Sequence, residues 1–89
     1  MEISKIKNNI EKLKQIKHGL EKNPNYMCID CHIRMLNEQI SFLKEEEGCG
    51  ELVELIRANI VQYYVDRLDI KQIVNSVSKL IEILKTKVQ

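Results

Sequence analysis

The sequence contains few of the residues that interrupt or bend regular structure. Its 89 residues include one proline, three glycines and no tryptophan, and aromatic side chains make up 4% of the chain. Sandwich and barrel folds need many short strands joined by glycine and proline turns, and their strands are enriched in aromatic residues. The composition therefore disfavours a β-sandwich or a β-barrel.

Long apolar segments are also missing. No apolar run approaches the ~20 residues that a transmembrane helix requires, and the opening MEISKIKNNI lacks the apolar segment of a signal peptide. We therefore expect a cytoplasmic protein that does not enter membranes. In that reducing compartment the three cysteines are not expected to form structural disulfides, which leaves metal binding, redox chemistry or simple burial.

The chain also lacks a strong net charge. The formal net charge is +1 at pH 7, which gives no overall electrostatic reason to bind nucleic acid. The charge is nevertheless segregated, because residues 35–54 carry one basic and six acidic side chains. We interpret the three consecutive glutamates at 45–47 as an acidic docking surface or as a solubility feature, and most other charges as solvated helix faces.

Apolar residues recur at helical spacing along most of the chain. Those of the first segment are Ile3, Ile6, Ile10, Leu13, Ile16 and Leu20. Such steps of three and four residues predict four helices, with turns near Pro24 and Gly48. We expect them at about residues 3–22, 26–47, 51–67 and 70–87. The prediction is a single all-α domain over residues 1–89, a small four-helix bundle built from two helical hairpins.

The third of these helices is apolar around much of its circumference. Its apolar residues are Leu52, Val53, Leu55, Ile56, Ile60, Val61, Tyr63, Tyr64 and Val65. Together with the stripes on the other helices, this exceeds what one minimal bundle can bury. We therefore expect the chain to self-associate as a homodimer that covers the surplus.

The stretch NYMCIDCHIRM gathers the residue types that bind metals. Cys28 and Cys31 have the CxxC spacing that lets two thiolates point at one zinc ion, and on a helix His32 falls within the same face. A tetrahedral ion still needs a fourth ligand. If the hairpin turns at about Pro24, His18 lies level with this group on the first helix. The sequence thus predicts a zinc site with two cysteine and two histidine ligands.

Cys49 stands apart from this cluster. In a continuous second helix it would lie about 27 Å from Cys31, because a helix rises roughly 1.5 Å per residue. It would then serve as a ligand only across an antiparallel dimer. In a third arrangement, two chains share one ion between their four CxxC thiolates.

The alternatives to zinc are burial, redox chemistry and haem attachment. Cysteine often packs as a small apolar residue, so Cys28 beside Met27 and Ile29 can equally be part of the core. A thioredoxin-like redox site needs a βαβ pattern that the sequence lacks. The CxxCH motif of c-type haem attachment needs export, for which no signal is present.

Catalysis is not expected, because no phosphate-binding glycine loop is present and no oxyanion-hole turn accompanies the Cys–His pair. A helix-turn-helix formed by the last two helices is an alternative. The residues that it would expose are Lys71, Asn75, Ser78 and Lys79. The long apolar stripe of the last helix favours the bundle core instead, so nucleic acid is the less favoured partner.

Two short resemblances accompany the cysteine motif. The sequence CID at residues 28–30, after a basic first helix, resembles the copper-responsive CsoR family of repressors. The histidine and cysteine that those proteins use farther along their second helix have no counterpart here. The CxxC between two heptad-like helices also resembles zinc-hook coiled coils, without their usual proline and glycine. Neither resemblance transfers metal sensing or DNA binding to this chain.

The leading functional prediction is a small regulatory protein that binds another protein, with a zinc ion pinning its first hairpin. The alternative is a metal- or redox-responsive regulator that binds DNA. The third possibility is a structural bundle with buried cysteines and no metal.

Overall fold

A computed structural model of the protein describes residues 2–22, 26–66 and 70–89, with the backbone alone for residues 26–28. The predicted turn at Pro24 and the predicted end of the third helix at 67 lie outside these residues. Within them the structure contains only helices and turns: α1 (Ile3–Lys22), α2 (Tyr26–Ser41), α3 (Gly50–Asp66) and α4 (Lys71–Lys87).

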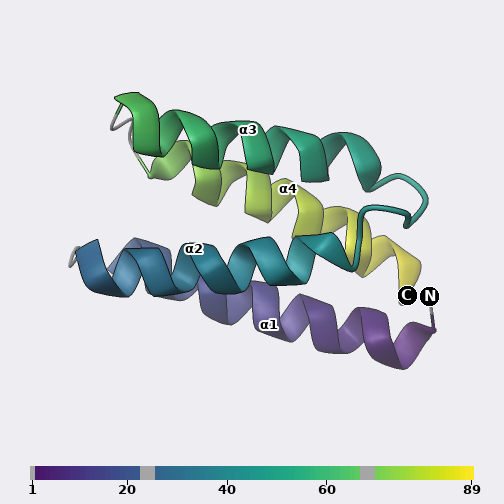
Figure 1. The fold of residues 1–89 in the computed structure, drawn as a ribbon. Coiled ribbons are helices and arrows are strands. Elements are labelled where there is room, and N and C mark those ends of the chain that lie inside the picture. Colours follow the sequence, from purple (N-terminus) through teal and green to yellow (C-terminus); the bar gives the residue numbers. More distant parts are fainter. Residues whose placement is uncertain (1, 23–25, 67–69) are drawn as a thin grey trace.

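The four helices run alternately up and down and form two hairpins, α1–α2 and α3–α4 (Figure 1). Helix α1 packs against α2 and α4, and α3 packs against α4 and α2, while in the described residues no Cα atoms of the diagonal pairs come within 8 Å of each other. The contact between α1 and α4 is the most extensive and that between α2 and α3 the least. The predicted all-α four-helix bundle of two hairpins is confirmed.

The helices form where the apolar spacing predicts them because each buries one stripe. In α1 the buried side chains include Ile6, Ile10, Leu13, Ile16 and Leu20. These steps of three and four residues place them on one face, which the other helices cover. The lysines of α1 between them remain exposed or half-buried.

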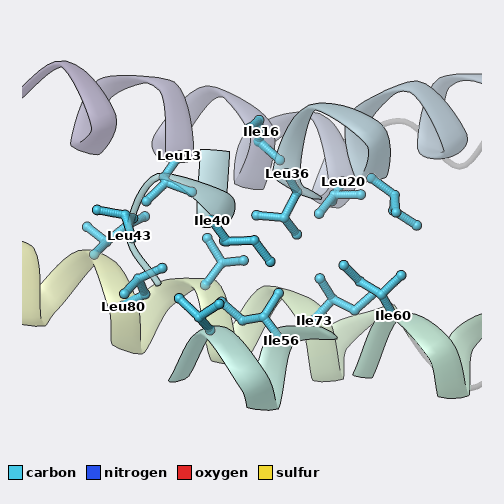
Figure 2. Close-up of a cluster of buried hydrophobic side chains, with 14 of the residues drawn as sticks. Leu13, Ile16, Leu20, Leu36, Ile40, Leu43, Ile56, Ile60, Ile73 and Leu80 are labelled. Carbon is cyan, nitrogen blue, oxygen red and sulfur yellow. The ribbon is translucent and has the colours of Figure 1, made fainter. Parts of the chain in front are cut away.

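The core lies between the two hairpins. In Figure 2, side chains from α1 and α2 point toward side chains from α3 and α4. Residues with no exposed surface include Leu13, Leu36, Ile40, Leu43, Ile56, Ile73, Leu80 and Leu84. Because every helix contributes to this one cluster, the chain folds around a single core.

The second helix ends earlier than predicted. We expected it to continue to residue 47, but it ends at Ser41, whose hydroxyl donates a hydrogen bond of 2.6 Å to the Glu38 carbonyl. The backbone amides of Phe42 and Leu43 then bond carbonyls only three residues back, which tightens the chain into turns. Leu43, which lies within these turns, is fully buried.

The segment between α2 and α3 is a series of such turns. Gly48 has a φ of +82°, the left-handed conformation expected of it, although it follows turns rather than a helix end. The glutamates at 45–47 therefore do not sit in the last turn of a helix. The unfavourable interaction with the helix dipole that a helix to residue 47 would entail is avoided.

None of the helices in the described part of the chain is long and apolar enough to cross a membrane.

Candidate functional site

The CxxCH segment forms the start of α2. Cys31 is exposed, His32 is half-buried, and His18 on α1 is exposed, while the side chain of Cys28 lies outside the described residues. Among the described side chains, no three His, Cys, Asp or Glu residues converge as metal ligands do. The proposed ligand set includes Cys28, so the zinc site stays a prediction.

Helix α1 meets this segment at a glycine. The imidazole of His32 lies so close to Gly19 that a Cβ atom at position 19 would collide with its Nε2 atom. Gly19 is buried and follows His18 directly in the chain. The structure therefore brings the imidazole of His32 close to the stretch of α1 that carries His18.

Asp30, inside the CxxCH segment, is attached to the other hairpin. The Tyr64 hydroxyl of α3 donates a hydrogen bond of 2.8 Å to Asp30 Oδ1. Tyr63 packs edge-on against the Tyr64 ring, with ring centroids 5.3 Å apart. Because α2 and α3 share few other contacts, this bond helps to fix the start of α2 against α3.

Cys49 belongs to the core rather than to the CxxCH segment. It has no exposed surface, and burial raises the pKa of its thiol, an effect that nearby Lys87 opposes and Glu46 reinforces. Lys87 and Glu46 form an ion pair of 3.7 Å, which joins the end of α4 to the turns after α2. A ligand role for Cys49 across a dimer would therefore require these turns to open.

A hollow lies on the surface between α1 and α2. It has a volume of about 780 Å³ and is lined by Glu2, Lys5, Asn8, Asn9, Lys12, Gln39 and Phe42. A second hollow of about 270 Å³ is lined by Lys12, Gln15, Ile16, Met35, Glu38 and Gln39. The two hollows share Lys12 and Gln39, so they adjoin each other along the helix pair. We call them together the α1–α2 groove.

Gln39 is the unusual residue of the α1–α2 groove. Its side chain is 8% exposed, and its Oε1 atom has no hydrogen-bond partner in the described structure. A buried acceptor without a donor costs about 1–3 kcal/mol, so such atoms are rare in native proteins. The atom is itself sealed from solvent, so an external donor could reach it only if the side chain moved.

Two apolar side chains flank Gln39 on the surface. Met35 is 48% exposed and Phe42 is 58% exposed. With Gln39 they form a second stripe on the α2 side, distinct from the one that faces the core. Sequence spacing alone would assign both apolar residues to the edge of the core stripe. It misses Gln39, because a glutamine in a helix is ordinarily solvated and nothing local marks this one as buried.

One of the four residues that the alternative helix-turn-helix would expose is half-buried in the bundle. Lys71, Asn75 and Lys79 are exposed, but Ser78 is half-buried and its hydroxyl donates to the Val74 carbonyl at 3.0 Å. The side-chain amide of Asn59 on α3 donates a hydrogen bond of 2.6 Å to the hydroxyl of Ser76 on α4, and this bond joins the two helices. The two helices thus pack as an antiparallel hairpin of the bundle (Figure 1).

No protein-family model matches the chain, and the comparisons with curated proteins and with solved structures found no relative. The functional argument therefore rests on the α1–α2 groove and on the CxxCH segment.

Proposed function

We propose that this protein is a small helical interaction module that binds another protein through the α1–α2 groove. The observation that carries the proposal is the pair of exposed apolar side chains, Met35 and Phe42, that line the hollows between α1 and α2. Interfaces commonly combine an apolar centre with a polar rim. A partner that covers the two apolar side chains removes them from water.

The shape of the groove favours a protein segment over a small molecule. It is open to solvent and extends along two helices, whereas small-molecule sites enclose most of their ligand. An amphipathic helix laid along such a groove presents side chains at regular spacing to its walls.

Photo-crosslinking tests this assignment. A benzophenone amino acid at position 42 should crosslink a partner in cells that express the protein. The same residue at position 65 should give a crosslinking yield that is lower by about one order of magnitude. Val65 is a matched control, because it is an exposed apolar residue (71%) on α3, away from the groove. Equal yields at the two positions, or none at either, would contradict the proposal.

We further propose that zinc pins the first hairpin through Cys28, Cys31, His32 and His18. The support is chemical and positional. Two thiolates and two imidazoles form a familiar structural zinc set, and His32 lies against Gly19, next to His18 in the chain. A small domain often gains stability from such an ion, because its core alone gives a narrow margin. A zinc ion here would hold α1 to α2 beside their shared turn.

Metal content is the direct measurement. Protein purified under reducing conditions without added metal should contain about one zinc per chain, or one per two chains if the ion is shared. The variants Cys31→Ser and His32→Ala should lose it, whereas Cys49→Ser should keep it because Cys49 is buried elsewhere. Protein that is folded and free of zinc would eliminate this part of the proposal.

A further inference from the structure

We infer that Gly19 is a positioning residue: it leaves the space in which the imidazole of His32 lies against α1, and this contact sets the register of the first hairpin. Through His32 the contact also orients one of the proposed zinc ligands, and this second part rests on the proposed zinc function. Three observations carry it: the space beside Gly19, the register of α1 and α2, and the place of this glycine inside a helix.

The imidazole of His32 occupies the space that a side chain at residue 19 would take. A Cβ atom on Gly19 would overlap three ring atoms, Nε2, Cδ2 and Cε1. Gly19 is buried and His32 is half-buried, so the contact lies at the edge of the core. Because every other residue type carries a Cβ atom, any of them at position 19 would displace the ring. We call this contact the Gly19 seat.

The register of the Gly19 seat extends along the helix pair. Asn9 lies ten residues before Gly19, and Phe42 lies ten residues after His32. Asn9 and Phe42 line the same hollow between α1 and α2. Equal steps in opposite directions are what two antiparallel helices in one register produce. The seat and the hollow therefore belong to a single alignment of the hairpin.

A different alignment would lose the seat. Gly19 is the only glycine in the stretch of sequence that forms α1. Sliding α2 along α1 by about one turn would bring the imidazole of His32 opposite Ile16 or Lys22, and both carry long side chains. The ring therefore fits closely against α1 in one register, which favours that register over its neighbours.

Gly19 is otherwise a poor residue for its position. It lies inside α1, three residues before the helix ends at Lys22. Among the described glycines only Gly48 has a positive φ, so the backbone at Gly19 does not require glycine. Alanine inside a helix is favoured over glycine by a factor of about five in the folding equilibrium. The space for His32 accounts for a glycine here, whereas the backbone conformation does not.

The Gly19 seat also bears on the proposed zinc site. His18 directly precedes Gly19, and Cys31 directly precedes His32. A ring held against α1 keeps the first turns of α2, with Cys31, beside the stretch that carries His18. Residues that orient a metal ligand typically change metal affinity by about tenfold to a hundredfold when they are replaced. Gly19 would act in this way through His32, without itself touching the metal.

A double-mutant cycle between positions 19 and 32 tests the seat without metal. The four proteins are the wild type, Gly19→Ala, His32→Ala and the double variant, each unfolded by urea in reducing buffer that contains a chelator. In the His32→Ala background, alanine at position 19 should raise the folding equilibrium constant by about fivefold, because the space is then empty and alanine is the better helix former. With His32 present this gain should be absent or reversed.

Gly50→Ala is the matched control for the cycle. Gly50 opens α3, beyond the end of α2 that is farther from His32. A Cβ atom there would meet the Lys44 carbonyl oxygen at 3.5 Å, which is an ordinary contact distance. The effect of Gly50→Ala should therefore be the same with histidine or alanine at position 32, within about twofold.

The ring of His32 reports its own displacement. In metal-free Gly19→Ala, the nuclear magnetic resonance signals of the Cδ2 and Cε1 protons of His32 should shift, because the ring has left α1. Gly50→Ala should leave them in place. A substitution that only lowers stability changes the population of the folded chain and not these positions, so unshifted signals in Gly19→Ala overturn the seat.

Zinc titration separates this inference from the proposed function. Gly19→Ala should bind zinc about tenfold or more weakly than the wild type. A wild-type chain that binds no zinc eliminates the zinc site, and the cycle and the ring signals then decide the seat alone. Equal effects of Gly19→Ala in the two backgrounds overturn the seat, whether or not zinc binds. Coupling without any loss of zinc affinity overturns the orienting role.

Discussion

Replacing Leu36 with alanine should lower the free energy of unfolding by about 3 kcal/mol, because it empties a fully buried site between the two hairpins. A domain of this length has a total stability of roughly 5–13 kcal/mol, so the loss is a large share of it. Urea unfolding followed by circular dichroism would show the midpoint fall with an unchanged slope.

Leu55→Ala is the matched control for this change. The residue type and the helical setting are the same, but Leu55 is 43% exposed on α3. Its truncation should cost less than about 1 kcal/mol, because little apolar area is lost and no enclosed cavity forms. Equal losses for the two variants would show that the core does not lie between the hairpins as described.

The stability of the protein should also fall above about pH 8.5 through Cys49. Burial raises the pKa of this thiol in the folded chain, so the unfolded chain ionises first as the pH rises. Stability is then fully present below the unfolded pKa, and it declines by up to about 1.4 kcal/mol per pH unit between the unfolded and folded values. The decline continues until the folded thiol also ionises, and it is absent at neutral pH.

The measurement is urea unfolding at pH 7.5 and pH 10 for the wild type and for Cys49→Ala. Lysine and tyrosine residues titrate in the same range, so the informative quantity is the difference between the two proteins. The alanine variant removes the thiol and should show a smaller decline. Parallel declines in the two proteins would mean that Cys49 ionises as readily in the folded chain as in the unfolded one.

The sequence predicted the elements of the fold well because their determinants are local. The apolar residues of α1, from Ile6 to Leu20, repeat at helical spacing, and this pattern alone indicates both the helix and its buried face. Two such hairpins of similar length leave an antiparallel bundle as the simplest way to cover every stripe.

The end of α2 was not predictable in the same way. The pattern of apolar residues continues through Leu43, so it favoured a helix as far as residue 47. The chain instead turns after Ser41, and the turns carry Leu43 and Cys49, both of which are fully buried. Which conformation wins depends on partners that are distant in the sequence, and helical periodicity contains no information about them.

The two parts of the candidate site also differ in how far the sequence reveals them. The CxxCH segment is visible in the sequence, because its spacing is itself the chemical signal. The α1–α2 groove is not visible there, because Gln39 of α2 and Lys12 of α1 meet only when the first hairpin closes. A buried acceptor without a donor is a property of packing, and no residue type or spacing reports it.

The sequence by itself thus determined that the protein is helical, which face of each helix is buried and that the helices pair as two hairpins. These follow from interactions within about four residues along the chain and from the need to cover apolar stripes. Only the tertiary structure decided where α2 ends, that Cys49 lies in the core and that Gln39 is left unpaired in a surface groove. Each of these depends on which side chains from different helices compete for the same space.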